Sequence, residues 1–465
     1  MPLKKIYLKS LELNHFMNVS KGKIDFENKK KNDSFETVNH IMGIYGQNGS
    51  GKTAFIHALS IIKQCLSGES LDGDTVSYIQ IGFSELTLHV CWQALLNEEL
   101  VDIYYDISIT KNRDKNQSSA QINNETISIR KKDSRKARVL YTDDENVLGP
   151  KKILNQIIRF SQREIIDLQV EKGIVRSQGR SYLFSDELIK TLQKVLKSEQ
   201  TTKITIIKYI LQIFLSLKNF AQELLYVIGI KDIGYINLGI LLPFYFHMEK
   251  ANQHVFGSIP LPINGPGKIP SDVVQVVEKF VHDENKVLKY LIPGLQIRVK
   301  ILSQELDRNS QKVETVELIS MRDGQDIPLK YESAGIKKIL SVLHVFIGAY
   351  NNPSMIVAID ELDAGVFEYL LGELLGIFQE AGKGQLIFTS HNLRPLEILD
   401  KQSVVFTTTN PENRYVHLKN VKNNNLRDMY YRTILLGGQE EEMYQDTNRY
   451  ELELALRKVG IYGEE

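Results

Sequence analysis

The sequence predicts a mixed α/β fold, in which an antiparallel meander joins a parallel core and a helical insertion separates the two halves of the chain. Three observations predict it. An apolar run at 39–46 enters a glycine-rich turn, and residues with helical spacing follow at 53–66. Segments of period-two alternation lie between 83 and 132. Strand-like and helical segments then alternate between 331 and 409, which is the pattern of a parallel sheet covered by helices.

The elements fall into four parts along the chain. Alternating segments at 5–45 predict strands that end at the glycine turn, and the meander follows it. The pattern is helical from about residue 151 to 290, apart from a Pro/Gly-rich stretch at 257–271 that we expect to be a loop. We therefore expect an N-terminal half of the core, a helical insertion, a C-terminal half of the core and a C-terminal helical extension, at 1–150, 151–292, 293–420 and 421–465.

Composition is that of an ordinary globular protein. A length of 465 residues is enough for two or three domains with a buried core. Apolar residues make up 42% of the chain and charged residues 25%. Lys+Arg and Asp+Glu are both 57, so the net charge excludes a globally basic nucleic-acid binder but not a local basic patch. The two cysteines, Cys65 and Cys91, indicate no disulfide framework and a reducing compartment.

No segment predicts a membrane span. The longest uncharged apolar stretch, "IGYINLGILLPFYFHM" at 233–248, contains Pro243 and is shorter than the ~20 residues that a spanning helix needs. We read this stretch as buried core. The N-terminus has no apolar signal region, so we expect a cytoplasmic protein.

The stretch "GIYGQNGSGKTAF" at 43–55 fits the phosphate-loop pattern G-x-x-x-x-G-K-[ST]. Glycines let backbone N–H groups turn towards phosphate oxygens at a helix N-terminus, where the helix dipole favours anions. The lysine supplies a positive charge for the β- and γ-phosphates, and the hydroxyl of Thr53 is a ligand for Mg²⁺. A chance match in a glycine-rich turn is the alternative. The candidate ATP-binding residues are Gly46, Gln47, Asn48, Gly49, Ser50, Gly51, Lys52 and Thr53.

Two acids follow the apolar strand pattern in "MIVAIDELDAG" at 355–365. We expect Asp360 to be a carboxylate for Mg²⁺ and Glu361 to be the base that orients the attacking water. The alternative is a strand whose acids only begin the next helix.

Two further turns are candidates. In "GQLIFTSHNLRPLEIL" at 384–399, His391 comes just after a buried strand, where ligands bind in open α/β sheets. It could reach a γ-phosphate or the attacking water, or it could be a simple capping residue. In "YESAGIKKILSVL" at 331–343, Ser333 and Gly335 open a helix and could bind an anion, or could form an ordinary N-cap.

The order of these elements resembles that of ABC-type ATPases of the SMC/RecF/OLD class. The resemblance implies that two heads sandwich two ATP molecules. Ser333 and Gly335 would then contact the γ-phosphate bound by Lys52 of the partner subunit, and Asp363 would lie in the loop that links the heads. Gln162, in "IIRFSQREII", is the candidate glutamine-loop residue and a further candidate for the metal. The signature "ESAGIKK" departs from that of transporters, so we expect slow or conditional ATP hydrolysis.

More closely, the chain resembles the ATPase subunits of bacterial anti-phage modules such as AbiL and PARIS. The stretches "IDELDAGVFEYLLGELL", "GQLIFTSHNLRPLE" and "NNNLRDMYYRTILLGG" carry this resemblance. It implies a sensor and scaffold that controls a separately encoded effector, such as a Toprim-type nuclease, in response to a phage-derived trigger. The acids after residue 420 have helical spacing, so we expect no nuclease in this chain itself. We expect a homodimer or a multiple of dimers.

Two other functions remain open. A RecF/SMC-like DNA-repair ATPase would bind duplex DNA directly, through the basic runs "ENKKKND" and "SIRKKDSRKAR" at 27–33 and 128–138. Those runs could equally protect a hairpin edge from mispairing. A transporter-type ATPase is disfavoured by the signature and by the long insertion.

Overall fold

The computed structural model describes most of the chain, with gaps. The described residues are 4–27, 38–111, 119–131, 134, 136–143, 162–198, 203–229, 241–250, 253–263, 265–306, 310–322, 324–418, 425–436, 440–445 and 447–459.

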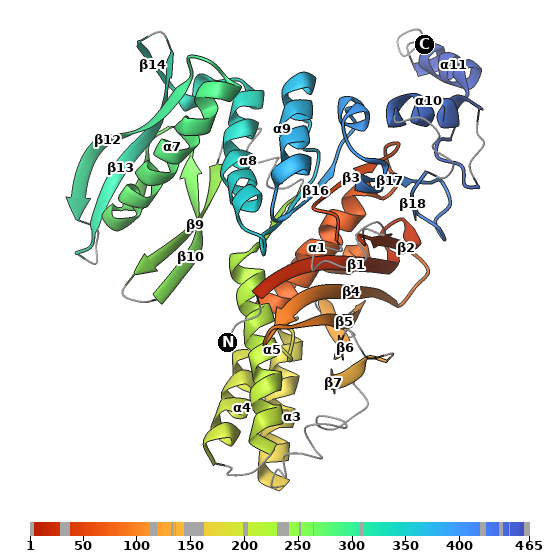
Figure 1. The fold of residues 1–465 in the computed structure, drawn as a ribbon, viewed down its shortest axis with the longest axis vertical. Coiled ribbons are helices and arrows are strands. Elements are labelled where there is room, and N and C mark those ends of the chain that lie inside the picture. The colour runs from red at the N-terminus through yellow and green to blue at the C-terminus, as the bar shows by residue number, and fades with distance from the viewer. Residues whose placement is uncertain are drawn as a thin grey trace, which may run out of the picture.

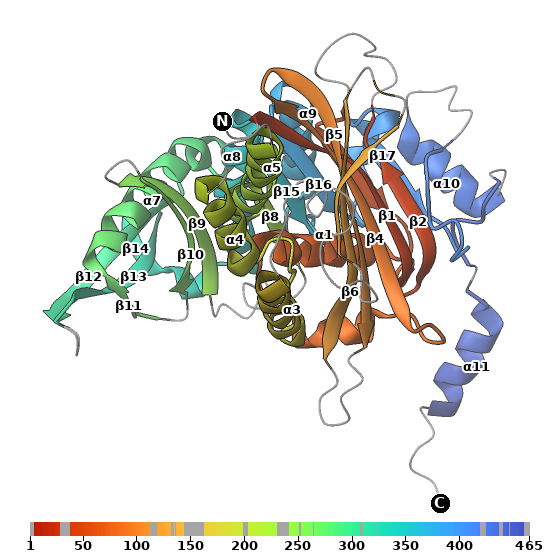
Figure 2. The same cartoon turned by 90° about the horizontal axis from the view of Figure 1, so that it is seen from below.

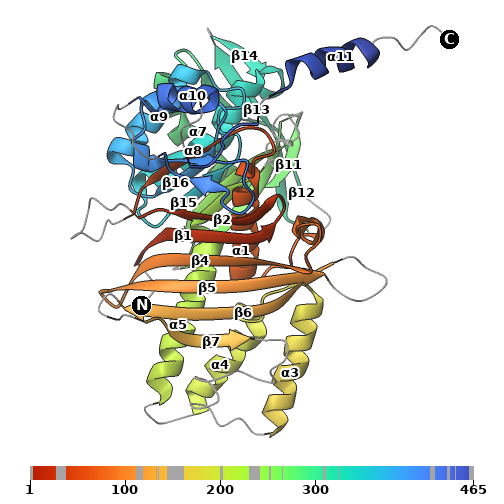
Figure 3. The same ribbon diagram turned by 90° about the vertical axis from the view of Figure 1, so that its right-hand side faces the viewer.

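An antiparallel sheet of six strands, in the order β2-β1-β4-β5-β6-β7, forms one layer of the core (Figure 3). Its strands alternate buried and exposed side chains, as a sheet with one face on the core requires. The predicted meander is confirmed. The strands are β1 (Lys4–Phe16), β2 (Val19–Asp25), β4 (Glu85–Leu96), β5 (Glu99–Lys111), β6 (Ala120–Lys131) and β7 (Arg138–Asp143).

A second six-stranded sheet has the order β18-β17-β3-β16-β15-β8, and every pair in it except β17–β18 is parallel. Its parallel strands are apolar and almost wholly buried because both faces are covered. The predicted parallel core is therefore confirmed. The strands are β3 (Ile41–Tyr45), β8 (Leu225–Ile228), β15 (Ile356–Ile359), β16 (Gln385–Thr389), β17 (Val404–Thr407) and β18 (Tyr415–Val416).

Helices pack on both faces of this second sheet. Helix α1 (Lys52–Ser67) lies between the two sheets, and α8 (Ala334–Asn351) and α9 (Glu368–Ala381) lie on the other face (Figure 2). Alternate residues of β15 accordingly belong to different cores, Ile356 to the one shared with α1 and Val357 to the one shared with α9. This packing brings the amino end of α1 to the carboxyl edge of the sheet.

The insertion is less helical than the sequence suggests. Helices α3 (Gln162–Ser177), α4 (Asp186–Ser198) and α5 (Lys203–Glu223) form a bundle at the bottom of Figure 1. The apolar run after α5, however, forms strand β8 and completes the parallel sheet. Short apolar runs have no periodicity that separates a buried strand from the end of a helix, and this explains the difference.

A hairpin occupies the second half of the stretch at 233–248 that we read as buried core, and it continues into the first residues of the proline-rich stretch at 257–271 that we expected to be a loop. Residues 233–240 lie outside the described residues. Among the described strands, β9 (Leu241–Lys250) and β10 (Gln253–Pro262) pair only with each other, with Pro260 opposite Pro243. Proline is tolerated there because a two-stranded ribbon has edges on both sides.

The remaining elements form a third layer and a C-terminal extension (Figure 1). Helix α7 packs against a small antiparallel sheet, and η2 then leads into α8.

The helix that we expected after His391 is only the short 3₁₀ helix η3, which contains Pro395. In the extension, Tyr430 of α10 stacks on Phe406 of β17 with ring centroids 4.8 Å apart, whereas α11 buries no residue. These elements are η1 (Gly73–Tyr78), β11 (Gly267–Pro270), α7 (Ser271–Leu291), β12 (Gln296–Leu306), β13 (Lys312–Arg322), β14 (Gln325–Pro328), η2 (Leu329–Tyr331), η3 (Arg394–Glu397), η4 (Lys401–Ser403), α10 (Leu426–Leu436) and α11 (Arg449–Val459).

None of the helices in the described part of the chain combines the length and apolarity needed to cross a membrane.

Candidate functional site

The predicted phosphate loop joins β3 to α1 at the carboxyl edge of the parallel sheet. Three of its glycines are required by the geometry. Gly46, Gly49 and Gly51 have φ angles of 155°, 75° and 95°, which L side chains rarely adopt. A Cβ atom on Gly46 would also lie 1.7 Å from the Thr407 hydroxyl oxygen.

Neighbouring elements hold the loop in place. Ser50 donates a hydrogen bond from its hydroxyl to the Gln47 carbonyl at 2.7 Å, and this hydroxyl also contacts that of Thr407. The Tyr415 hydroxyl donates to the Gly51 carbonyl at 2.7 Å. The loop is thus fixed from strands β17 and β18, as a preorganised ligand site requires.

The side chain of Lys52 folds back onto the phosphate loop and bonds to its backbone. Its Nζ atom donates to the carbonyl oxygens of Gly46 and Gln47 at 2.8 and 2.9 Å, and the residue is 7% exposed. Burial lowers the pKa of Lys52 to about 8, against the opposing influence of the carboxylates of Asp360 and Glu361, among others. The ammonium group is therefore close to these acids.

The amino end of α1 has the features of an anion site. Its N-cap, Gly51, offers no side-chain cap, and its first turn contains no acid. The first four N–H groups of an α-helix have no partner within the helix. With Lys52 beside them, they suit a phosphate group.

Thr389, at the end of β16, organises the two acids after β15. Its hydroxyl donates to the Asp360 Oδ1 atom at 2.5 Å, and it accepts the backbone N–H of Glu361 at 2.8 Å. Glu361 has a φ of 44°, an uncommon value for a residue with a side chain. The sequence reading missed Thr389, although its place at the end of a core strand beside the acids was visible.

Asp360 is suited to a divalent cation. It is 1% exposed, and its Oδ2 atom has no hydrogen-bond partner within the described residues. A buried carboxylate oxygen without a donor is costly unless a cation or ligand completes it, and Mg²⁺ prefers oxygen ligands. The residues present therefore fit the metal that the sequence predicts.

Asp363 positions the segment that carries His391. Its Oδ2 atom accepts the backbone N–H groups of His391 and Asn392 at 3.1 and 2.9 Å. The pKa of His391 is lowered by burial and then by the charge of Lys52, while the neighbouring acids oppose both effects. His391 thus belongs to the same electrostatic cluster as Lys52, Asp360 and Glu361.

The signature turn at 333–335 lies apart from this cluster, but it packs against Gly365 in the loop that contains Asp363. Ser333 is the N-cap of α8 and accepts the Ile336 N–H at 3.3 Å, which is the ordinary capping role that the sequence left open. A Cβ on Gly335 would lie 2.1 Å from the Gly365 carbonyl oxygen. No hydrogen bond or ion pair among described residues joins the signature turn to Lys52 of the same chain.

Two predicted features lie away from the cluster or outside the described side chains. Gln162 is the first residue of α3, and its side chain is not among those described, so its role stays a prediction. In the second basic run, Arg130 pairs with Asp102 at 2.5 Å and Lys131 pairs with Glu99. These two cations already have partners within the sheet. Most of the first basic run and several residues of the second lie outside the described residues.

The sequence reading also missed a C-terminal strap, which we define as residues 440–445. The Gln445 N–H donates to Gln47 Oε1 of the phosphate loop at 2.8 Å. Upstream, the Thr409 N–H donates to the Glu442 carbonyl at 2.8 Å, and Met443 is buried. Nothing in the local pattern signals this contact, because it joins segments almost 400 residues apart.

No family model and no curated protein sequence matches the chain. Among solved structures, the chain is similar to an Smc head domain with a coiled coil and joint from Pyrococcus yayanosii, at 12% identity and a TM-score of 0.43, over 91% of this chain and 99% of that one. It is also similar to an SmcHead bound to the C-winged helix domain of ScpA, at 14% identity and a TM-score of 0.42, over 90% of this chain and 98% of that one. For the recombination mediator protein RecF, the identity is 14% and the TM-score 0.35, over 83% of this chain and 93% of that one. Likenesses at this level do not decide the function, which must be argued from the residues of the site.

Proposed function

We propose that this protein is a P-loop ATPase of the ABC type that binds ATP with Mg²⁺ and hydrolyses it slowly or conditionally. One observation carries the proposal. Lys52, at the uncapped amino end of α1, shares an electrostatic cluster with Asp360, whose buried Oδ2 atom lacks a hydrogen-bond donor among the described residues. An anion site and a cation site in one cluster are what a metal–nucleotide complex needs.

The roles of the residues follow from their chemistry. Lys52 and the N–H groups of the loop hold the phosphates, and Thr53 and Asp360 would hold Mg²⁺, which when bound neutralises charge on the phosphate oxygens. Glu361 orients the attacking water and accepts its proton. His391 would contact the terminal phosphate, and the hydrogen bond from its backbone N–H to Asp363 would keep it in position.

The site of one chain is incomplete without a second head. Ser333 and Gly335 offer a hydroxyl group and a helix N-terminus, yet neither is joined to Lys52 of its own chain. Two heads related by a two-fold axis would bring this turn to the phosphates of the partner subunit. Native mass measured with Mg²⁺ and a non-hydrolysable ATP analogue tests this, and a strict monomer under saturating nucleotide would contradict it.

For the cellular role, we propose a sensor and scaffold of an anti-phage module that controls a separately encoded effector, such as a Toprim-type nuclease. The sequence resemblance to AbiL and PARIS subunits supports this role. Expression with the flanking genes, followed by native mass spectrometry with ATP, tests it. An assembly that retains a second polypeptide is the expected result.

Direct binding of duplex DNA is the competing role. The ion pairs of Arg130 and Lys131 leave those two side chains less available for phosphates. A dimer with no second polypeptide and with salt-dependent affinity for duplex DNA would overturn the defence role and favour repair.

A further inference from the structure

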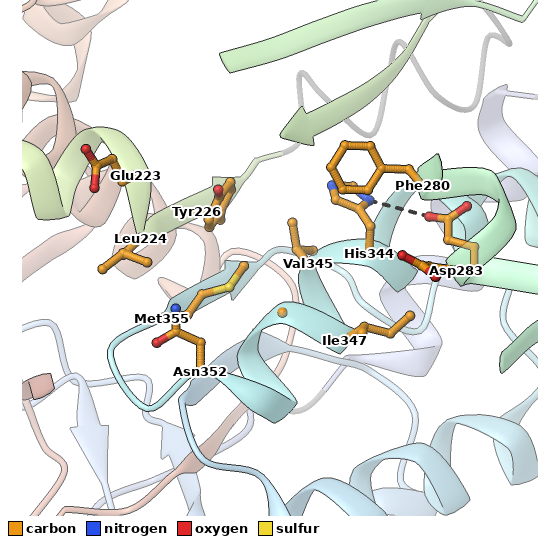
Figure 4. A pocket seen from close by; sticks show the side chains of 12 residues that line it. Glu223, Leu224, Tyr226, Phe280, Asp283, His344, Val345, Ile347, Asn352 and Met355 are labelled. Atoms are coloured by element: carbon orange, nitrogen blue, oxygen red, sulfur yellow. Dashed lines mark ion pairs between the residues drawn. The ribbon is translucent and has the colours of Figure 1, made fainter. Parts of the chain in front are cut away.

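A pocket of about 270 Å³ lies at the amino edge of the parallel sheet (Figure 4). It is formed by α7, the second half of α8 and the beginning of β8. Met355, which lines it, precedes β15, whereas Asp360 follows that strand. The pocket and the nucleotide cluster are therefore at opposite edges of the sheet.

The walls of the pocket are mostly apolar. Its apolar lining includes two aromatic rings, Tyr226 and Phe280, together with the side chains of Leu224, Val345, Ile347 and Met355. Cavities of about 150 Å³ are large enough to hold benzene. A pocket of this size accordingly has room for a single ring with a short substituent.

The polar lining is acidic. Glu223, Asp283 and Glu284 contribute carboxyl groups, and no Lys or Arg is among the lining residues that the structure describes. Asp283 is partly compensated by Lys286, whose Nζ lies 2.6 Å from its Oδ1. Among the described residues, no Lys or Arg forms an ion pair of this kind with Glu284.

Glu284 is the feature that points to a ligand. It is 2% exposed, and its Oε1 atom has no hydrogen-bond partner within the described residues. The Nδ1 atom of His344 lies 3.8 Å from this Oε1 atom (dashed line in Figure 4). That separation is too long for a hydrogen bond. A buried carboxyl oxygen that faces a pocket and lacks a donor is costly to maintain.

The electrostatics of the pair agree with this geometry. Burial raises the pKa of Glu284 to about 8, and burial lowers the pKa of His344 to about 4. Both groups are thus mainly neutral at neutral pH, and His344 does not supply a positive charge to Glu284. A cationic ligand would supply it.

We propose that this pocket binds a small organic ammonium ion that carries one apolar ring. The ammonium N–H groups donate to Glu284, and the ring packs against Phe280, Tyr226 and Met355. Aromatic side chains near a cation add a favourable interaction with its charge. This proposal does not depend on the nucleotide site, which lies across the sheet.

Benzylammonium is the test probe, and benzyl alcohol is its uncharged match. In titration calorimetry on the full chain, we expect benzylammonium to bind at least about tenfold more tightly than the alcohol, since one charge-assisted hydrogen bond is worth 1.5 kcal/mol or more. Binding near neutral pH also releases a proton from Glu284, which appears as a dependence of the heat on the ionisation enthalpy of the buffer.

Glu284→Gln is a nearly isosteric variant, and the exposed Glu278→Gln, outside the pocket on the same helix, is its control. The Glu284 variant should lose both the preference for the ammonium ion and the proton release, whereas the Glu278 variant should keep both. The proposal is overturned if benzylammonium does not bind, if the alcohol binds equally well, or if the preference survives in the Glu284 variant.

Discussion

Buried ionisable groups at the two edges of the parallel sheet differ in their hydrogen-bond partners. At the carboxyl edge, Lys52 donates to two carbonyl oxygens and Asp360 accepts from Thr389. At the amino edge, the Oε1 atom of Glu284 has no hydrogen-bond donor among the described residues, and burial raises the pKa of Glu284 to about 8. Burial alone drives a group towards its neutral form, whereas nearby donors and opposite charges oppose that effect.

This difference indicates which edge performs charge-dependent chemistry. Fixed partners keep the carboxyl edge ready for phosphate and metal. The amino edge can hold a charge only when a ligand supplies the counter-charge. Four substitutions test the contrast, and they follow in order of the expected effect.

Replacing Lys52 by Ala should disrupt the carboxyl edge most severely. The variant loses charge-assisted hydrogen bonds to the phosphates, so affinity for ATP should fall about 100-fold or more. A titration with a fluorescent ATP analogue measures it. Lys63→Ala, about three turns further along α1, is the matched control and should bind ATP normally. Normal affinity in the Lys52 variant would contradict the phosphate-loop assignment.

Replacing Glu361 by Gln should separate binding from hydrolysis at the same edge. A general base contributes about 100-fold or more to the rate, so turnover should fall by that factor while ATP affinity stays within about twofold. Phosphate release and native mass report the two effects, and the variant should accumulate a closed dimer. Glu368→Gln, an acid in the first turn of α9, should leave turnover unchanged. Undiminished turnover in the Glu361 variant would assign the base to another residue.

Replacing Glu284 by Gln should change how stability depends on pH. The folded-state pKa of about 8 exceeds the ordinary value of 4.5, so the wild type loses stability as the pH rises between these two values. The variant lacks this loss of stability, so its free energy of unfolding should gain about 3 to 4 kcal/mol relative to the wild type between about pH 5 and about pH 8. Urea unfolding at several pH values measures it. The exposed Glu278→Gln on the same helix should follow the wild type, and parallel curves for all three proteins would show that Glu284 does not titrate as described.

Replacing Thr389 by Val should give the smallest effect. The variant keeps the shape of the side chain but removes the donor to Asp360 and the acceptor for the Glu361 N–H. We expect a loss of about 1 kcal/mol in the free energy of unfolding and a lower turnover number, with ATP affinity less affected. Thr433→Val, which removes a hydrogen bond within α10, should lower stability without changing turnover. Unchanged turnover in the Thr389 variant would mean that the two acids are positioned without it.

The sequence by itself predicted the antiparallel meander, the parallel strands β3, β15, β16 and β17, and many residues of the candidate site. Period-two alternation predicted the meander because its strands have one buried face. The glycine loop was visible because positive φ angles and a lysine at the start of a helix impose a recognisable spacing. Asp360, Glu361 and His391 were visible for a related reason, since they follow the apolar core strands directly.

Only the tertiary structure decided the features that depend on distant segments. Leu225–Ile228 is a strand because an open edge of the parallel sheet accepts it, and its own apolar run could equally have ended a helix. Thr389 reaches two acids, and Gln445 reaches Gln47, because folding brings separate segments together. The environment of Glu284 is likewise set by α7, α8 and β8 together. Local sequence carries periodicity and turn chemistry, whereas burial and partnership are properties of the packed chain.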